Sequence, residues 1–401
     1  LRLFGRRFIF TIGNDLNTAL KEANFVFYNR KKLKDTSGEK FNLPKINDTE
    51  IKMAYICSVD TLRSMYVNEK GLFAGLPWFF QFWSRDELIS VKALMMIGMR
   101  KQAEDLLRKY LYCLGVNHKI RNKSQAPDLD SADAIGWLFK RLDDYFRIFG
   151  KSSFSKEVGT LFLQKLIIAV DEILIYNTES GLAKNNSKET WMDTSFEGDD
   201  RSGFRIEIQA LRLFIYRFMF NLTNESKYKS LELSLKRLVM KNFWNGKYLA
   251  DGLNDWTIRP NTFIAYYLYP DLLDKSEWAD CFKNSLKYLW LDYGGVASIS
   301  KSHRLFTPSH TGEDTKSYHR GDSWFWINDL SAIAMYRVDK KKFERFIKRI
   351  ITASKNEILY SGAIGRHAEV SSANELKSQG CLMQTWSSAM FIELVKEVGV
   401  K

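Results

Sequence analysis

Cysteine and histidine are both scarce in this 401-residue sequence. The four cysteines (Cys57, Cys113, Cys281 and Cys381) are widely spaced without a CxxC pair, and the five histidines form no HExxH-type ligand pair. This spacing argues against a zinc site and against a disulfide framework, and it is typical of a reducing compartment. We therefore expect a cytoplasmic protein that needs no metal and no other cofactor.

Proline and long apolar runs are also rare. The sequence holds six prolines and no Ser/Gly/Pro-rich run, and its apolar stretches, such as "LFLQKLIIAV", fall far short of a membrane span. The chain opens with "LRLFGRRFIF", which has neither an initiator Met nor the pattern of a signal peptide. We interpret residues 1–13 as a remnant of, or link to, a missing N-terminal domain, and residues 14–401 as one domain.

The formal net charge of +13 raises the question of a nucleic-acid partner. Basic residues are interspersed with acidic ones along predicted helix surfaces, as in "KQAEDLLRKY", whereas a nucleic-acid binder gathers its charge in a stripe or tail. We therefore expect neither a nucleic-acid nor a membrane partner, and the sequence does not indicate an oligomeric state. Aromatic residues are more informative, because many of the 11 Trp and 18 Tyr lie in predicted loops.

Helical periodicity dominates the sequence. After an entry helix at 14–32, twelve further segments are predicted: 48–67, 85–97, 99–113, 131–149, 154–176, 204–221, 224–241, 259–269, 274–290, 320–337, 340–354 and 380–397. Short and long connections alternate between them. Twelve helices in six hairpins, with short turns at one end and long loops at the other, predict an all-α (α/α)6 barrel, a six-hairpin toroid. An open α-solenoid is the alternative, but no strong internal repeat supports it.

The long loops and the helix ends beside them combine aromatic residues with Asp, Glu and Arg, which suits a sugar pocket. Asp193 of "TWMD" and Glu369 of "GRHAEV" follow the fifth and eleventh helices, so both face the same end of the barrel. Glycoside hydrolysis needs two carboxyl groups, and an apolar setting raises the pKa of the one that acts as an acid. The alternative is two ordinary capping or salt-bridging carboxylates.

Other loop residues have both structural and functional interpretations. The sequence "SRDE" predicts a capping box of Ser84 and Glu87, from which the two middle residues reach a ligand. For His319, beside an arginine, we favour a hydrogen-bonding role over that of a general base. The tryptophans best placed for stacking on a sugar are Trp78, Trp83, Trp191 and Trp386.

In this order, the motifs resemble the C-terminal amylo-α-1,6-glucosidase domain of archaeal and bacterial glycogen-debranching enzymes. The matching stretches, from about residue 70 to 395, are "FQFWSRDELIS", "LDSADAIGWLF", "TWMDTSFEGDDRSGFRIEIQAL", "IRPNTFIAYYL", "YHRGDSWFWIN" and "GAIGRHAEV…GCLMQTWSSAMFIEL". The resemblance implies a glucoamylase-related (α/α)6 barrel in which Asp193 is the general acid and Glu369 the general base of an inverting hydrolysis. Their carboxyl groups would then lie roughly 6.5–9.5 Å apart.

The resemblance also implies a set of residues that line the pocket for a terminal glucose: Arg85, Asp86, Asp133, Arg205, Glu207, Tyr318, His319, Gln384 and Trp386. Arg205 and Glu207 are two residues apart at a helix start, so we expect one of them to support a loop instead of the sugar.

Two departures leave the cleaved bond open. Phe82 and Ser84 replace the first Asp and the Gly of the family's F-x-D-W-G-R-D, and "YHRG" replaces Y-H-Q-G. The expected activity is release of glucose from α-1,6-linked branch stubs of glycogen-like glucans. The alternatives are a glucoamylase- or trehalase-like hydrolase of α-1,4 or α,α-1,1 links, and a non-catalytic glycan-binding barrel. A disaccharide phosphorylase would lack a base, so Glu369 argues against it.

Overall fold

The computed structural model describes residues 2–4, 7–9, 15–29, 44–114, 119–122 and 130–399. For residues 2–4, 7–9 and 151–160 it describes the backbone alone. The chain divides into two units, Leu1–Leu43 and Pro44–Lys401. In the first, β1 (Arg2–Phe4) pairs with β2 (Arg7–Ile9), and α1 (Leu16–Asn29) follows. None of the α1 residues is buried. The entry helix therefore belongs to the first unit, whereas the sequence placed it with the barrel.

The second unit is a helical barrel. Its helices are α2 (Thr49–Met65), α3 (Ser84–Met96), α4 (Arg100–Cys113), α5 (Ala134–Phe149), α6 (Lys151–Tyr176), α7 (Ile206–Thr223), α8 (Ser226–Phe243), α9 (Asn261–Leu268), α10 (Lys275–Leu289), α11 (Phe325–Tyr360) and α12 (Thr385–Val398). A non-helical Asp339 (φ −159°, ψ 93°) divides α11 into two helices. Counted this way, the described part of the unit has twelve α-helices, as the sequence predicts.

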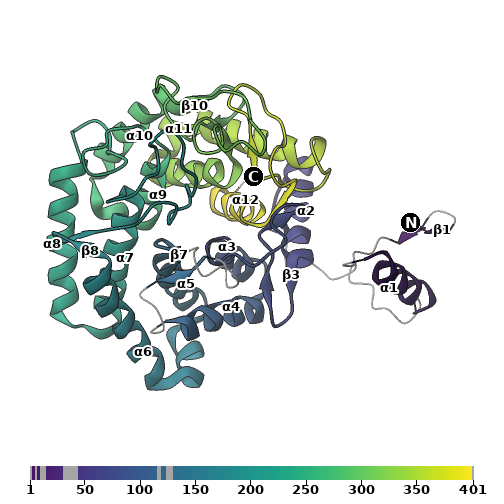
Figure 1. Ribbon diagram of the computed structural model, residues 1–401, viewed down its shortest axis with the longest axis horizontal. Coiled ribbons are helices and arrows are strands. Elements are labelled where there is room, and N and C mark those ends of the chain that lie inside the picture. The colour runs from purple at the N-terminus through teal and green to yellow at the C-terminus, as the bar shows by residue number, and fades with distance from the viewer. Residues whose placement is uncertain are drawn as a thin grey trace. The chain divides into compact units, whose positions relative to one another are not determined.

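Six of these helices form a closed inner ring. Each of them contacts the next: α3 contacts α5, α5 contacts α7, α7 contacts α9, α9 contacts α11, α11 contacts α12, and α12 contacts α3. The inner helices are buried almost all round; in α7 thirteen residues are buried, including Glu207 and Gln209. Outer helices bury one stripe instead, as α4 does with Ala103, Leu106, Leu107, Tyr110 and Leu111. Figure 1 shows one outer helix, α8, at the margin of the unit beyond α7.

Tight turns join the helices at one end of the barrel. Gly98 (φ +87°), Gly150 (φ +84°) and Asn224 (φ +59°) have positive φ angles within two residues of the ends of α3, α5 and α7. Glycine and asparagine tolerate this conformation, so a helix ends there and the next can begin at once. Three of the short connections predicted from the sequence are thereby confirmed.

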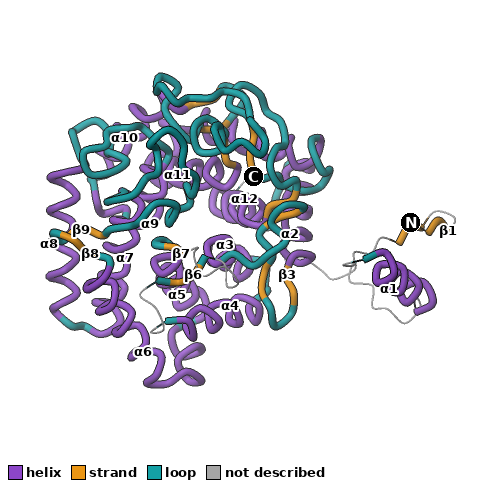
Figure 2. The backbone as a smooth tube through the Cα atoms, in the orientation of Figure 1, coloured by secondary structure: helices purple, strands orange, loops and turns teal. Residues whose placement is uncertain are grey.

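Two-stranded antiparallel sheets stiffen the long loops at the other end (Figure 2). The pairs are β3 (Tyr66–Val67) with β4 (Gly71–Leu72), β5 (Gly75–Leu76) with β14 (Met383–Gln384), β6 (Ile120–Arg121) with β7 (Asp130–Ser131), β8 (Thr178–Glu179) with β9 (Leu182–Ala183), β10 (Trp290–Leu291) with β11 (Gly295–Val296), and β12 (Ser323–Trp324) with β13 (Val370–Ser371). Because β12 and β14 precede them directly, α11 and α12 begin at 325 and 385, not at the predicted 320 and 380.

The N-termini of the inner helices bear most of the residues singled out in the sequence. The residues at their N-cap positions are Trp83, Asp133, Arg205, Pro260, Trp324 and Gln384. None of these six side chains caps its own helix, whereas Asp48 caps α2 and Asp274 forms a capping box in α10. The side chains at these positions do not satisfy the free backbone N–H groups of their helices, a pattern expected where such residues serve a functional site.

The predicted capping box at α3 is wrong. Ser84 is the first helical residue rather than the cap. The Glu87 carboxylate accepts instead from the backbone N–H of Leu72 at 2.7 Å and from Lys109 Nζ at 2.7 Å. Glu87 therefore fixes the preceding loop to α4, a tertiary role that outweighs the local cap.

Candidate active site

A cavity of about 280 Å³ lies beside the N-termini of α3, α11 and α12. This is close to the lower limit of pockets that hold small molecules, about 300 Å³. It is lined by Ala74, Phe79, Trp83, Arg85, Asp86, Asn122, Lys188, Trp191, Asp193, Thr194, Thr315, Tyr318, Trp324, Glu369, Gln384 and Trp386. Nine of the residues predicted from the sequence are therefore brought together: Trp83, Arg85, Asp86, Trp191, Asp193, Tyr318, Glu369, Gln384 and Trp386. We call this space the sugar cavity.

Asp193 is held in the cavity wall by one guanidinium group. Arg85 donates from Nη1 to Asp193 Oδ2 at 3.1 Å and from Nε to Asp133 Oδ2 at 2.7 Å. Burial raises the pKa of Asp193, and the charge of Arg85 acts against that rise. The Asp193 side chain is still 30% exposed toward the cavity. A ligand in the cavity would exclude solvent from the exposed part of the side chain and raise the pKa of Asp193 further.

Glu369 is held more tightly, by two donors. The Tyr318 hydroxyl donates to Oε1, and the backbone N–H of Cys381 donates to Oε2 at 3.0 Å. The Glu369 backbone is fixed as well, through its N–H to Cys381 O at 2.8 Å and its carbonyl to Phe325 N at 3.2 Å. Burial raises the pKa of Glu369 to about 7, and both donors oppose that rise by favouring the ionised form.

Polar atoms beside the cavity have unused hydrogen-bonding capacity. Gln384 Nε2 donates to Asp86 Oδ1 at 3.0 Å. Among the described residues, Arg85 Nη2, Gln384 Oε1 and Trp386 Nε1 are buried without a hydrogen-bond partner. Buried polar groups are rarely left unsatisfied, so these three atoms suit a ligand that has several hydroxyl groups.

Aromatic rings form the rest of the wall. Trp324 lies at ring-centroid distances of 4.5 Å from Tyr318 and 5.7 Å from Trp386. Trp191 is oriented by its Nε1–H, which donates to Asn261 Oδ1 at 2.7 Å. Rings fixed in this way can stack on the C–H face of a sugar at little entropic cost.

Four of the predicted pocket residues lie behind the wall: Asp133, Arg205, Glu207 and His319 do not line the sugar cavity. Asp133 accepts from Arg85 and from the Ser131 hydroxyl. Arg205 pairs with Asp255 at 2.6 Å, and Glu207 pairs with Arg201 at 2.9 Å. Their carboxylate and guanidinium groups bind neighbouring residues, and none of the three lines the cavity.

His319 supports the cavity from behind. Its ring stacks on Trp324 at 5.0 Å, and its Nδ1 lies 2.8 Å from Thr194 Oγ1. Burial and the nearby charge of Arg320 lower the pKa of His319 well below its usual value. Burial therefore keeps the imidazole neutral at pH 7 and makes it a weak base, so a hydrogen-bonding role stays our prediction for His319.

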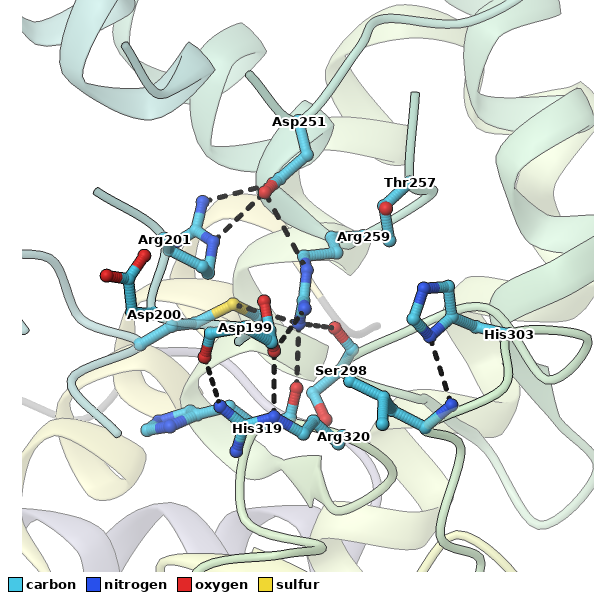
Figure 3. Close-up of polar contacts among 12 residues, drawn as sticks. Asp199, Asp200, Arg201, Asp251, Thr257, Arg259, Ser298, His303, His319 and Arg320 are labelled. Carbon is cyan, nitrogen blue, oxygen red and sulfur yellow. Dashed lines mark hydrogen bonds and ion pairs between the residues drawn. The ribbon is translucent and has the colours of Figure 1, made fainter. Parts of the chain in front are cut away.

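A network of arginines and aspartates binds the loops behind His319 together (Figure 3). Asp199 Oδ2 lies 2.8 Å from both Arg259 Nη2 and Arg320 Nε. Arg201 holds Asp251 in the same network, through contacts of 3.0 Å from Nε and from Nη2. Each buried cation thus has a carboxylate partner, as the cost of burying charge requires.

Arg320 ties this network to the loop that carries Asp193. Its Nη2 donates to Thr194 O at 3.0 Å and to Asp199 O at 2.7 Å. We expect Arg320→Gln to lower the free energy of unfolding by about 1.5–3 kcal/mol, the range for hydrogen bonds to charged groups, and to reduce kcat/KM as the loop loosens. Urea unfolding measures the first effect. Arg304→Gln, at an exposed ion pair with Glu197, is the matched control; equal stability of the two variants would contradict this role of Arg320.

Several lining residues were not predicted from the sequence. The sequence places Trp324 inside the helix predicted at 320–337, so it was not expected to line a pocket. Phe79, Thr194 and Thr315 have no chemical signature of their own. Arg201 and Asp251, which are central to the supporting network, are charged loop residues like many others. The only available signal was proximity to a motif, since Thr194 directly follows Asp193.

Fold and cavity together place the protein in the class of six-hairpin (α/α)6 barrels. Similar solved structures include a wild-type glycosidase (12% identity, 89% of this chain and 100% of that chain, TM-score 0.62) and a rhamnosidase from Klebsiella oxytoca with rhamnose bound (11%, 89% and 65%, 0.63). Another is a cellobiose 2-epimerase from Bacillus thermoamylovorans (13%, 85% and 98%, 0.60). At these identities the likeness concerns the fold alone.

The chain belongs to the amylo-alpha-1,6-glucosidase family, whose model matches residues 52–393. This range covers almost the whole second unit, and it confirms the resemblance deduced from the motifs. The protein is accordingly a glycosidase-type enzyme with a carbohydrate substrate. A search of curated proteins finds no significant match to the chain. In the part of the chain that the structure describes, no helix is both long and apolar enough to cross a membrane.

Proposed function

We propose that the protein is an inverting, exo-acting hydrolase that releases glucose from α-1,6-linked branch stubs of glycogen-like glucans in the cytoplasm. One observation carries the proposal: Asp193 and Glu369 line the same small cavity but have different hydrogen-bond partners. A cavity of about 280 Å³ suits one terminal sugar rather than a length of chain, which supports exo action.

Asp193 is the proposed general acid. One of its oxygens accepts from Arg85, while burial raises its pKa toward the protonated form that an acid needs. Protonated Asp193 gives its proton to the glycosidic oxygen as the bond from that oxygen to the anomeric carbon breaks. Substrate binding removes the remaining water from its side chain and favours this state.

Glu369 is the proposed general base. Two donors hold its carboxylate in one orientation and favour its ionised form. Ionised Glu369 accepts a proton from a water molecule, which attacks the anomeric carbon from the side opposite the leaving oxygen. The separation of roughly 6.5–9.5 Å between the two carboxyl groups stays a prediction of this mechanism.

Glucose release from panose, maltotriose and trehalose tests the bond specificity. The proposal expects the α-1,6 bond of panose to be cleaved fastest. Faster cleavage of maltotriose or trehalose would favour the glucoamylase-like or trehalase-like alternative, and the absence of cleavage would favour a glycan-binding barrel. Phe82 and Ser84, where the chain departs from the debranching pattern, make this comparison necessary.

The pH profile tests the role of Glu369. A base must be ionised, so kcat/KM falls as the pH drops through the Glu369 pKa of about 7. The Tyr318 hydroxyl donates to Glu369 and lowers that pKa. Tyr318→Phe therefore raises the pKa and moves the acid limb of the profile to higher pH. Tyr360→Phe, an exposed tyrosine that donates to Glu50, is the matched control; a shift of the acid limb to lower pH in Tyr318→Phe would contradict the assignment.

A further inference from the structure

A second cavity of about 640 Å³ adjoins the sugar cavity. The two share four lining residues: Phe79, Thr315, Tyr318 and Glu369. The remaining lining of the second cavity comprises Pro77, Trp78, His310, Gly312, Glu313, Ser378, Gln379, Gly380 and Leu382. Asp193 lines the sugar cavity but does not line the second cavity. We call the second cavity the base-side chamber.

The position of the two carboxyl groups decides which reactant each cavity can hold. An acid must contact the glycosidic oxygen, so the departing sugar lies on the side of Asp193. Inversion brings water to the opposite face of the sugar ring, next to the base. A chamber that reaches Glu369 but not Asp193 therefore lies on the water side of the reaction. Its mouth is open to solvent, because Trp78 is 67% exposed and Leu382 is 37% exposed.

One titratable side chain in the chamber has a fixed orientation. His310 Nδ1 lies 2.6 Å from Asp322 Oδ2, and the same oxygen accepts from the Ser317 hydroxyl at 2.9 Å. The His310 backbone N–H donates to Ser372 Oγ at 3.0 Å. A carboxylate cannot donate, so Nδ1 carries the hydrogen and Nε2 is the nitrogen that can accept one. His310 and Glu369 line the same chamber.

We propose that the base-side chamber is the route by which water reaches Glu369 while a sugar occupies the sugar cavity, and that His310 carries the proton away afterwards. This inference rests on the proposed hydrolytic function. A sugar that fills the sugar cavity excludes solvent from that cavity, whereas the base-side chamber stays open to solvent. The ligand of the chamber is thus water, and His310 is a positioning residue that acts through Glu369.

The protons balance over one turnover. Glu369 takes a proton from water as the new C–O bond forms, and Asp193 gives its proton to the oxygen of the breaking bond. Glu369 is then protonated and Asp193 ionised. The proton on Glu369 passes through chamber water to His310 Nε2 and from His310 to bulk water. Asp193 regains a proton from bulk solvent after the products leave the sugar cavity.

α-Glucosyl fluoride and isomaltose, assayed side by side, test the proposal, because fluoride leaves without a proton from Asp193 and reports on the water side alone. We expect His310→Ala to lower kcat about 10-fold for both substrates, which is less than the 10²–10⁴-fold of a direct general base, with KM unchanged. Added imidazole restores part of the loss. His303→Ala, a partly buried histidine outside both cavities, is the matched control.

A second variant narrows the chamber without touching His310. Leu382→Trp, at its open side, should lower kcat for both substrates and leave glucose affinity unchanged; Ile364→Trp, 72% exposed and outside the lining, is its control. Wild-type kcat in either test variant overturns the proposal. A KM that is raised in either variant only for a long branched dextrin also overturns the proposal, because the chamber would then hold a glucan chain instead of water. A wild-type enzyme that hydrolyses no substrate refutes the proposed function itself.

Discussion

Glu369→Gln and Asp193→Asn are each expected to lower kcat/KM by about 10²–10⁴-fold, the contribution of a positioned acid or base. Both substitutions keep the size of the side chain and remove only its ability to exchange a proton. The two variants should differ in their activity on α-glucosyl fluoride. Asp193→Asn should recover much of its activity, because fluoride needs no proton to leave, whereas Glu369→Gln should stay inactive because water still has no base.

Glu375→Gln is the matched control for this experiment, since Glu375 lies exposed in the same loop as Glu369. It should behave as the wild type. Near-normal glucose release by Glu369→Gln or Asp193→Asn would refute the assignment of these residues. Recovery of Glu369→Gln, and not of Asp193→Asn, on the fluoride would reverse the two roles.

Gly380→Ala is the second change with a large expected effect. A Cβ atom at Gly380 would lie 2.2 Å from Glu369 Oε2, so the carboxylate must move away from its two donors. A displacement of about 1 Å at a reacting group can cost on the order of 10²-fold in rate. We expect a loss of this size in kcat/KM with a small loss of stability, about 1–2 kcal/mol from the left-handed backbone at φ +65°.

Gly246→Ala separates the two effects. Gly246 has a similar φ of +82°, but a Cβ atom there would meet nothing within 4 Å. It should lose stability as Gly380→Ala does and keep full activity. Wild-type kcat/KM in Gly380→Ala would show that the position of Glu369 is not critical, against the proposed mechanism.

The fold was largely readable from the sequence because helical burial is periodic. Buried residues of α4 recur at the spacing of one helix face, and Gly98, Gly150 and Asn224, all with positive φ angles, mark the tight turns. The helix starts were less predictable. Residues 323–324 and 383–384 continue the helical pattern in sequence, yet they pair with strands from distant loops. Such pairing depends on tertiary contacts that a local pattern does not contain.

The site was predictable where a residue type matched a chemical task. Asp193, Glu369, Arg85 and Tyr318 line the sugar cavity together, although they lie far apart in the sequence. Arg205 and Glu207 belong to equally distinctive motifs, yet they bind Asp255 and Arg201 behind the wall. A motif alone does not distinguish contact with a ligand from support of the loop that provides the contact.

The close approach of Gly380 to Glu369 and the base-side chamber have no sequence signal. Gly380 resembles any other loop glycine, and its requirement arises from a carboxylate eleven positions earlier in the chain. The chamber is formed by short stretches of three loops that meet only in the folded protein. The orientation of His310 likewise depends on Asp322 and Ser317, which are placed by the turn between them and β12.

The anomeric form of the released glucose tests the central claim most directly. The protein is mixed with an α-1,6-linked substrate such as isomaltose, and proton NMR follows the first-formed sugar before it mutarotates. Attack by a water molecule that Glu369 activates, opposite the oxygen that Asp193 protonates, predicts β-glucose as the initial product. Initial release of α-glucose would mean retention, and it would contradict the account of Glu369 as a base that activates water.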